Sequence, residues 1–314
     1  MATALTPTGR GVPTITSSPI EALDNAGATW YVKDDPGLEQ LGQLDFLDDI
    51  GLPVPERLSP DENHMAVRSS GITLNEAVAS NTLPAGRTIR MAGVLLGKTH
   101  DSLERAEAEG LAPEKTAPDS STTAHPAANF HHRFAEGKSS STNAMYGDLP
   151  ENGLGVRSSL LELIELLGEQ EIPESVGGED ELSYGDFKPD NLLYAAESGL
   201  VLIDPLVHRG RRVNDFAKFC TRFAIEPTAP DSDIRTQLQE SYRQAGGQEF
   251  REGDVALSGA LDLANVMSSY LGRLAKGDTS FRIVGHLNSD TAYAERVEGL
   301  VRAALAEVDR GGSE

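Results

Sequence analysis

The stretch Tyr184–Ala195, which reads YGDFKPDNLLYA, decides most of what this 314-residue chain says about its fold and chemistry. The apolar run Leu200–Ile203 follows it and ends at Asp204. Two short apolar runs around a turn at residues 197–199 predict a β-hairpin. Such a hairpin would bring Asn191, at the start of its first strand, close to Asp204, at the end of its second.

The polar residues of this stretch have the spacing that phosphoryl transfer requires. Asn191 follows Asp186 by five residues, and Asp204 follows Asn191 by thirteen. In kinases one Asp accepts the proton of the attacking hydroxyl, while an Asn and a second Asp hold the magnesium that bridges the nucleotide phosphates. Pro189 fixes a backbone φ angle in the turn between the two functions. Because Mg²⁺ takes only one or two protein oxygens beside phosphates and water, so sparse a set is sufficient.

The same stretch resembles the catalytic loop of the aminoglycoside phosphotransferase and choline kinase group of protein-kinase-like enzymes, which commonly reads His-Gly-Asp-x-x-Pro-x-Asn. The chain keeps Gly185, Asp186, Pro189 and Asn191, has Tyr184 in place of the histidine, and shares Lys188 with protein serine/threonine kinases. The resemblance implies that Asp186 is the catalytic base and that Lys188 neutralises charge on the moving phosphoryl group. It also implies that Asn191 and Asp204 are the metal ligands.

Upstream elements appear in the order that this family shows. Residues 28–33 form a β-branched and aromatic run that ends at Lys33, and residues 38–47 carry a helical apolar stripe that Gly51–Pro55 ends. The family has a lysine strand, a helix with a glutamate, and then Pro-Val-Pro. The resemblance implies that Lys33 positions the nucleotide phosphates and that Glu39 is its ion-pair partner, although counting back from Pro55 puts Gln40 at the usual position.

The run of residues 65–74 resembles the strand and linker that pair with adenine through backbone groups. Val67 and Ser69 would supply those groups. A loop over the phosphates is less clear, with Gly9–Gly11 before a candidate strand at residues 12–16 as the one candidate. A Walker-type Gly-x-x-x-x-Gly-Lys-Ser/Thr loop is absent from the sequence.

Downstream, the run Gly210–Ala217 resembles the family's Gly-x-x-x-x-Asp-Leu-Ala, in which the Asp, here Asp215, braces the catalytic loop. Ten residues separate Asp204 from Asp215, no Asp-Phe-Gly occurs, and no Ala-Pro-Glu follows Asp204. A regulated protein kinase needs a longer segment here for activation and peptide docking. A small-molecule acceptor is therefore expected.

Composition limits the partners and the compartment. The net charge of −22, from 27 basic and 49 acidic residues, argues against a nucleic-acid partner. The acidity fits either general solubility and salt adaptation, which we favour, or an acidic cleft for a cationic acceptor. The single cysteine, Cys220, excludes an internal disulfide framework, and no apolar run approaches eighteen residues. We expect no membrane partner and a cytoplasmic location.

The rest of the chain is expected to be mainly helical. A loop-rich insertion spans residues 112–157, a helix opens at the Ser159–Glu162 capping box, and further helices lie near 232–245, 255–275 and 289–308. The histidines 125, 131 and 132 are expected to be loop residues without a metal. His100 is expected to be a packed structural residue. The motif-like run Gly147–Asn152 is expected to be a loop, because its Asn falls one residue early.

The sequence thus predicts an α+β, two-lobed protein-kinase-like fold. Residues 1–70 would form a small antiparallel-sheet lobe that binds nucleotide, and residues 71–314 a larger, mainly helical lobe for catalysis and acceptor binding. The expected reaction moves the γ-phosphate of ATP or GTP, with Mg²⁺, to a hydroxyl of an antibiotic such as an aminoglycoside, an amino sugar or an amino alcohol. A protein serine/threonine kinase and a catalytically inactive nucleotide-binding scaffold are the alternatives, and the oligomeric state is left open.

Overall fold

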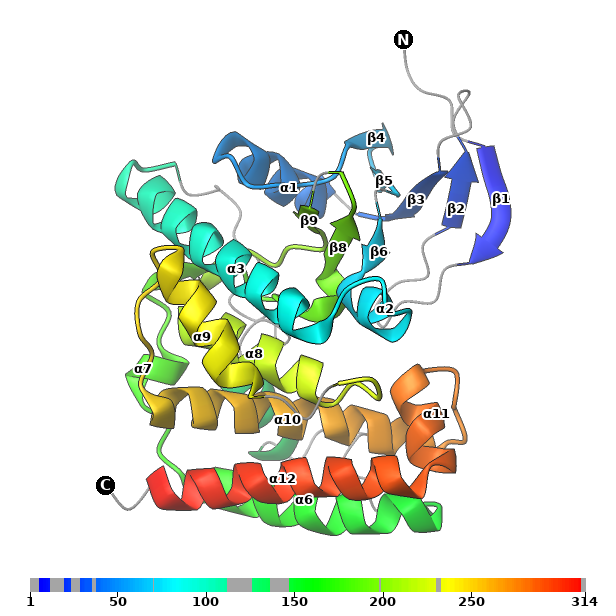
Figure 1. Ribbon diagram of the computed structural model, residues 1–314, viewed down its shortest axis with the longest axis vertical. Coiled ribbons are helices and arrows are strands. Elements are labelled where there is room, and N and C mark those ends of the chain that lie inside the picture. Colours follow the sequence, from blue (N-terminus) through cyan, green and yellow to red (C-terminus); the bar gives the residue numbers. More distant parts are fainter. Residues whose placement is uncertain are drawn as a thin grey trace.

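The computed structural model describes residues 6–11, 20–23, 29–35, 38–69, 71–111, 126–135, 147–197, 199–229 and 233–311. Strands lie mostly in the N-terminal part, and helices make up most of the rest (Figure 1). The expected strand at residues 12–16 falls outside the described residues. The mixed α and β composition with small antiparallel sheets agrees with the expected class.

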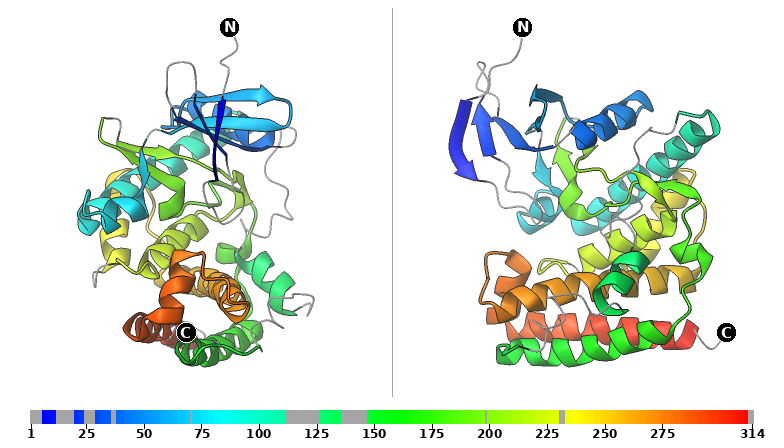
Figure 2. Two further views of the ribbon diagram at one scale, coloured as in Figure 1. Left: turned by 90° about the vertical axis from the view of Figure 1, so that its right-hand side faces the viewer. Right: turned by 180° about the vertical axis from the view of Figure 1, so that it is seen from behind.

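The largest sheet is antiparallel and has five strands in the order β1-β2-β3-β5-β4. These strands are β1 (Thr6–Gly11), β2 (Ile20–Leu23), β3 (Thr29–Asp34), β4 (Arg57–Asp61) and β5 (His64–Arg68). In the β3–β5 register Lys33 stands opposite Met65, which is fully buried. Helix α1 (Glu39–Asp49) connects β3 to β4 and is drawn next to the sheet in two views (Figures 1 and 2).

Asp35 starts helix α1, because its carboxylate accepts hydrogen bonds from two backbone N–H groups of the first turn. The N–H groups of Gln40 and Leu41 each lie 2.9 Å from an oxygen of Asp35. The helix then buries Leu44 and Leu47, two of the residues of the expected apolar stripe. The helix predicted over residues 38–47 is therefore confirmed.

Two small sheets carry the middle of the chain. One has the order β6-β8-β9, with β6 (Ile72–Thr73), β8 (Leu192–Ala195) and β9 (Gly199–Leu202). The other pairs β7 (Glu181–Ser183) with β10 (His208–Gly210). The predicted hairpin is thus present as β8 and β9, in which Leu192 pairs with Leu202.

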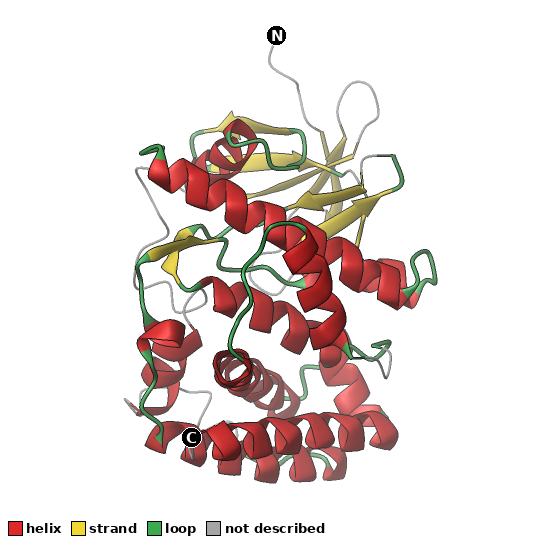
Figure 3. Cartoon of the chain, turned by 60° about the vertical axis from the view of Figure 1, so that its left-hand side comes forward, coloured by secondary structure: helices red, strands yellow, loops and turns green. Residues whose placement is uncertain are grey.

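Helices build the rest of the molecule, and Figure 3 shows them occupying most of the end opposite the large sheet. They are α2 (Leu74–Ala79), α3 (Ala85–Ala108), α4 (Pro126–Phe130), the π-helix η2 (His131–Ala135), α6 (Glu151–Glu169), α7 (Glu174–Gly177), the 3₁₀ turn η3 (Pro189–Asn191), α8 (Arg212–Ala224), α9 (Ile234–Gln244), α10 (Glu252–Ala275), α11 (Arg282–Ser289) and α12 (Thr291–Gly311). In the described part of the chain, no helix is both long and apolar enough to span a membrane.

Two apolar clusters fix the helices in place. One joins α3, α8 and α9 to the β8–β9 hairpin, and Phe187 of the stretch Tyr184–Ala195 lies inside it. The other joins α6, α10 and α12, the layer drawn at the bottom of Figure 1. Helix α8 belongs to the first cluster together with Phe187, and its Phe219 ring packs against that of Phe187, so this helix supports the stretch Tyr184–Ala195.

Several predicted boundaries were wrong. The helix expected to open at Ser159 begins at Glu151, and Ser159 is buried in its interior. The run Gly147–Asn152 is therefore loop only as far as Pro150, which stands at the N-cap position. His131 and His132 lie in η2 and not in a loop. Proline is common at the start of helices, so Pro150 was a signal that competed with the capping-box pattern at Ser159.

Candidate active site

The hairpin β8–β9 brings Asn191 and Asp204 together, as its sequence predicts. The N–H of Ile203 donates to the carbonyl oxygen of Asn191 at 3.0 Å. The side-chain amide of Asn191 lies 3.5 Å from the backbone carbonyl of Asp204. Asp204 has a φ of 52°, a left-handed conformation that Asp adopts more readily than most side chains. The chain turns at Asp204, shortly after the end of β9. The side chain of Asp204 is 36% exposed.

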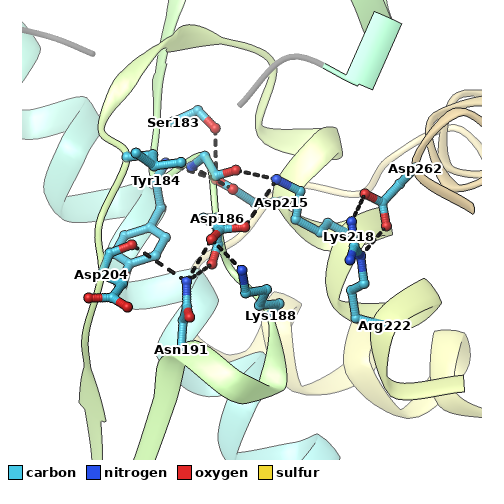
Figure 4. A network of polar contacts seen from close by, with 12 residues as sticks. Ser183, Tyr184, Asp186, Lys188, Asn191, Asp204, Asp215, Lys218, Arg222 and Asp262 are labelled. Atoms are coloured by element: carbon cyan, nitrogen blue, oxygen red, sulfur yellow. Dashed lines mark hydrogen bonds and ion pairs between the residues drawn. The ribbon is translucent and has the colours of Figure 1, made fainter. Parts of the chain in front are cut away.

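Asp186 is held by three nitrogen donors. Its Oδ2 accepts from Lys188 Nζ at 2.6 Å and from Asn191 Nδ2 at 2.8 Å, and its Oδ1 lies 3.4 Å from Lys218 Nζ. Burial by itself would raise the pKa of Asp186, but the two neighbouring ammonium groups outweigh it and hold that pKa well below its usual range. Asp186 is therefore a carboxylate, and its orientation is fixed from several sides (Figure 4).

Gly185 is required by the backbone that presents Asp186. Its φ is 82°, and a Cβ at this position would collide with the carbonyl oxygen of Leu206 and the ring of His208. Only glycine combines this left-handed conformation with so close an approach of the chain after Asp204. The Gly-Asp pair of the motif therefore reflects a steric need of the loop.

Asp215, from the first turn of α8, braces the same loop. Its Oδ1 accepts the Gly185 N–H at 2.7 Å, and its Oδ2 accepts the Tyr184 N–H at 2.9 Å and the Ser183 hydroxyl at 2.7 Å. His100 Nε2 adds a contact at 3.1 Å. The bracing role expected of Asp215 is thus what its contacts show. His100, which is 2% exposed, is packed and structural, as expected.

Tyr184 fills the position where the resembled loop has a histidine. It is fully buried, and its hydroxyl donates to the carbonyl oxygen of Ile203 at 2.6 Å. Burial raises the pKa of Tyr184 well above its usual value, with further contributions from the carboxylates of Asp204 and Asp186, so the phenol stays protonated and able to donate. Tyr184 therefore joins the loop of Asp186 to the residue that precedes Asp204.

Lys33 reaches the site from β3 and forms an ion pair with the carboxylate of Asp204, 171 residues further along the chain. Its side chain is 9% exposed. The predicted pairing of Lys33 with Glu39 is not found, because Glu39 is exposed at the start of α1. The residue of α1 that does reach this region is Gln43, whose Oε1 accepts the N–H of Val207 at 2.9 Å.

The large sheet pairs with the chain at Val67 and uses the N–H of Ser69. Val67 stands between two strands of the large sheet, opposite Tyr31 of β3 and Arg57 of β4. The N–H of Ser69 donates to the carbonyl oxygen of Thr29 at 2.9 Å. The sheet therefore already uses the Ser69 donor, because β5 pairs with β3 for one residue beyond its last ladder position.

Sequence reasoning missed three groups around the site. Lys218 is one, and Arg222, which contacts both oxygens of Asp262 at 2.8 Å, lies one turn further along α8. The third is a network in which Asn75 Nδ2 donates to Asp190 and to Glu226 at 2.7 Å each. Lys218 and Arg222 follow Asp215 at positions i+3 and i+7, so helical spacing from the bracing residue could have identified both.

Glu226 is buried in that network and differs from the other carboxylates. Burial raises its pKa to about 8, the carboxylate of Asp190 adds to the effect, and Arg282 and Arg296 oppose it. Arg282 forms an ion pair with Glu226, and Arg296 donates to the Glu226 backbone carbonyl at 2.5 Å. The network thereby links α2, η3, α11 and α12 beside the catalytic loop.

The donor set fits a hard divalent cation. The amide nitrogen of Asn191 is bound to Asp186, which turns the amide oxygen of Asn191 away from that carboxylate. Asp204 offers a partly exposed carboxylate beside it, and amide and carboxylate oxygens are ligands that Mg²⁺ accepts. Among the described residues no group of three or more His, Cys, Asp or Glu gathers as a protein-only metal cage.

Comparisons with known proteins bear on the fold of the chain. Neither a protein-family model nor the sequence of a curated protein matches the chain. A proposed aminoglycoside phosphotransferase from Ralstonia eutropha has a similar structure, with a TM-score of 0.59 at 14% identity, over 96% of this chain and 94% of that one. A choline/ethanolamine kinase family protein from Mesorhizobium loti gives 0.52 at 13%, over 96% and 92%.

A spectinomycin phosphotransferase in complex with ADP and spectinomycin is similar as well. Its TM-score is 0.54 at 12% identity, over 96% of this chain and 92% of the other. At such identities the likeness concerns the course of the backbone, and it extends over nearly the whole of each chain. The chain therefore has the fold of the aminoglycoside phosphotransferases and choline/ethanolamine kinases.

Proposed function

We propose that this chain is an ATP- and Mg²⁺-dependent phosphotransferase that moves the γ-phosphate to a hydroxyl group of a small molecule. One observation carries the proposal: Lys33, Asp186, Asn191 and Asp204, from three separate parts of the sequence, form one connected polar cluster. A lysine, a base and two metal ligands are the parts that phosphoryl transfer requires. The fold shared with known small-molecule phosphotransferases supports the same activity.

In this mechanism Asp186 orients the acceptor hydroxyl and accepts its proton. The hydroxyl oxygen forms a bond to the γ-phosphorus while the bond between that phosphorus and the β–γ bridging oxygen breaks, and ADP leaves. Lys188, which contacts Asp186 at 2.6 Å, would turn to the transferring phosphoryl oxygens. Lys33 would hold the nucleotide phosphates. When bound by Asn191 and Asp204, Mg²⁺ would offset the negative charge of the phosphates.

We assign the nucleotide to a lobe formed by residues 1–70 and the acceptor to a lobe formed by residues 71–314. The order of elements supports this division, since the large sheet supplies Lys33 and the later segments supply Asp186 and its neighbours. The N–H of Ser69 is used within the sheet, so the adenine contacts that we propose at Val67 and Ser69 would come from other backbone groups at the end of β5. The ADP complex of the similar spectinomycin phosphotransferase supports nucleotide binding in this fold.

A small molecule is the acceptor that we favour. Between Asp204 and Asp215 the chain forms β10 and then enters α8 at Arg212, which leaves little length for a peptide-docking segment. The alternative of an inactive scaffold rests on Tyr184 in place of the histidine, on the unclear glycine loop and on the doubtful helix glutamate. Tyr184 does not leave the loop unsupported, because its hydroxyl donates to the carbonyl oxygen of Ile203. We propose a cytoplasmic location because the cytoplasm supplies ATP.

A coupled assay of ADP release tests the proposal. The purified chain is supplied with ATP or GTP and Mg²⁺ and screened against aminoglycosides, other antibiotics, amino sugars, choline and homoserine. We expect acceptor-dependent ADP release, with a phosphorylated product seen by mass spectrometry and abolished in Asp186→Asn. Phosphate on a peptide library in place of a small molecule would identify a protein kinase. Nucleotide binding without any product would identify a scaffold.

A further inference from the structure

Lys218 is a buried cation beside the catalytic loop. It lies on α8, one turn after Asp215, and it is 2% exposed. Taking an ammonium group out of water is costly, and such groups are found in proteins only where charged or polar partners compensate. The partners of Lys218 therefore indicate why a lysine stands at this position.

Two of those partners are Asp186, the proposed base, and Gly185, the residue before it. The Lys218 ammonium donates to the carbonyl oxygen of Gly185 at 2.5 Å and lies 3.4 Å from Oδ1 of Asp186. Asp215 accepts the N–H of Gly185 at 2.7 Å. Helix α8 thus holds Gly185 by its N–H and by its carbonyl at once, through side chains three residues apart. Figure 4 shows these two side chains, Asp215 and Lys218, near Asp186.

Holding both groups of Gly185 fixes the direction of the next residue. The Gly185 carbonyl belongs to the peptide unit that leads into Asp186, and Gly185 itself has a left-handed φ of 82°. Without a hydrogen bond to its carbonyl, a glycine can rotate more freely than any other residue. Lys218 therefore restrains the peptide plane on which the Asp186 side chain depends.

Lys188 and Lys218 contact opposite oxygens of Asp186 but differ in their freedom. Lys188 belongs to the loop itself, contacts Oδ2, and has a side chain that is 14% exposed. Lys218 contacts Oδ1 from a helix in the apolar core. On the proposed function Lys188 turns to phosphate, and Lys218 is the cation that stays with Asp186.

We propose that Lys218 is a positioning residue for phosphoryl transfer, which fixes the Gly185 carbonyl and the Asp186 carboxylate in the orientation that an acceptor hydroxyl requires. The proposal rests on the proposed function. It acts through Asp186 and needs no contact between Lys218 and either substrate. It also gives α8 a second task beside the bracing by Asp215.

The test compares Lys218→Met with Phe223→Leu. Methionine keeps the length of the side chain and removes its donor and charge. Phe223 lies on the same helix, is buried, and stacks on Phe219, which in turn packs against Phe187, so its substitution disturbs α8 packing one side chain removed from the loop. We measure kcat, KM for ATP, the melting temperature, and amide hydrogen exchange of the peptide that covers residues 183–191.

We expect Lys218→Met to lower kcat about 10- to 100-fold through misorientation of Asp186, with KM for ATP within about twofold of the wild type. Exchange in residues 183–191 should become faster. Phe223→Leu should keep the kcat of the wild type, although its melting temperature should fall at least as far as that of Lys218→Met. If the methionine variant fails to fold, Lys218→Gln, which keeps a polar end, takes its place. It should also lower kcat and leave KM for ATP unchanged, with a smaller loss of kcat.

Three results would overturn the proposal. One is a kcat of the Lys218 variant within about twofold of the wild type together with unchanged exchange. Another is a loss of kcat that follows the melting temperature equally in the Lys218 and Phe223 variants, which would leave only a packing role. The third arises if the wild-type protein transfers no phosphate, and the Lys218 variant shows the same amide hydrogen exchange in residues 183–191 as the wild type. If such a chain instead shows faster exchange in the Lys218 variant, the proposed function fails while the restraint of the loop by Lys218 stands.

Discussion

The two carboxylates of the site, Asp186 and Asp204, are held in different ways. Asp186 is 15% exposed and has Lys188, Lys218 and Asn191 as partners, on a loop that Asp215 braces. Asp204 is 36% exposed, and its carboxylate forms an ion pair with Lys33 from the large sheet. The difference suggests a division of labour. On the proposed function, the Asp186 side is the fixed side, oriented before substrates arrive, and the Asp204 side is the exchangeable side, where a metal ion would replace Lys33.

The largest expected effect is on the fixed side. Asp186→Asn removes the proton acceptor and should lower kcat by about 10²- to 10⁴-fold, while the Kd for ATP stays within a few-fold. Steady-state kinetics and calorimetry with Mg²⁺ and ATP measure the two quantities. Asp148→Asn is the control, because Asp148 is exposed and stands in the motif-like run before α6. Equal turnover in the Asp186 and Asp148 variants would disprove the role of Asp186.

Asp215→Asn should weaken the bracing of the Asp186 loop and thereby lower the free energy of unfolding. Gly185 and Tyr184 donate to different oxygens of Asp215, so the NH2 group of an amide would face one of these two N–H groups and leave that buried donor unsatisfied. We expect a loss of about 3 kcal/mol in the free energy of unfolding. Urea denaturation measures it. Asp45→Asn, which weakens an exposed pair with Arg57, should cost less than about 1 kcal/mol.

Asp204→Asn tests the exchangeable side. It should raise the Mg²⁺ concentration needed for half-maximal ATP binding by about 10-fold or more, since a proposed ligand is weakened and Lys33 loses its partner. The free energy of unfolding should change much less than in Asp215→Asn. The matched control is Asp34→Asn, because Asp34 directly follows Lys33 and is exposed. Unchanged Mg²⁺ dependence in the Asp204 variant would contradict its assignment as a ligand.

Tyr184→Phe should give the smallest effect. It tests the link between the Asp186 loop and the Asp204 segment, because Tyr184 connects the two. The change removes the hydroxyl that donates to Ile203 and leaves the ring in place. We expect a loss of about 1 kcal/mol in the free energy of unfolding and a reduction of kcat by only a few-fold. Denaturation and kinetics of the same samples measure both. A collapse of activity would show that the hydroxyl takes part in the chemistry.

Local sequence signals predicted the centre of the site well. The apolar runs and the turn of the hairpin, Gly185 and Pro189 in the loop, and the helix after Lys33 all appear where expected. Each rests on steric preferences of neighbouring residues. Glu39 was misassigned for the opposite reason: several polar residues lie in the first turns of α1, and spacing alone does not tell which one faces inward.

The sequence by itself determined that Asn191 and Asp204 meet, because the short hairpin between them allows little else. It also determined the turn at Gly185, where the steric preference of one residue is enough. Only the tertiary structure decided that Lys33 pairs with Asp204 and that Lys218 faces Asp186. Those partners lie far apart along the chain, and the packing of the large sheet and of α8 against the loop brings them together. Contacts of that kind depend on how the whole core fills its volume, which local spacing does not record.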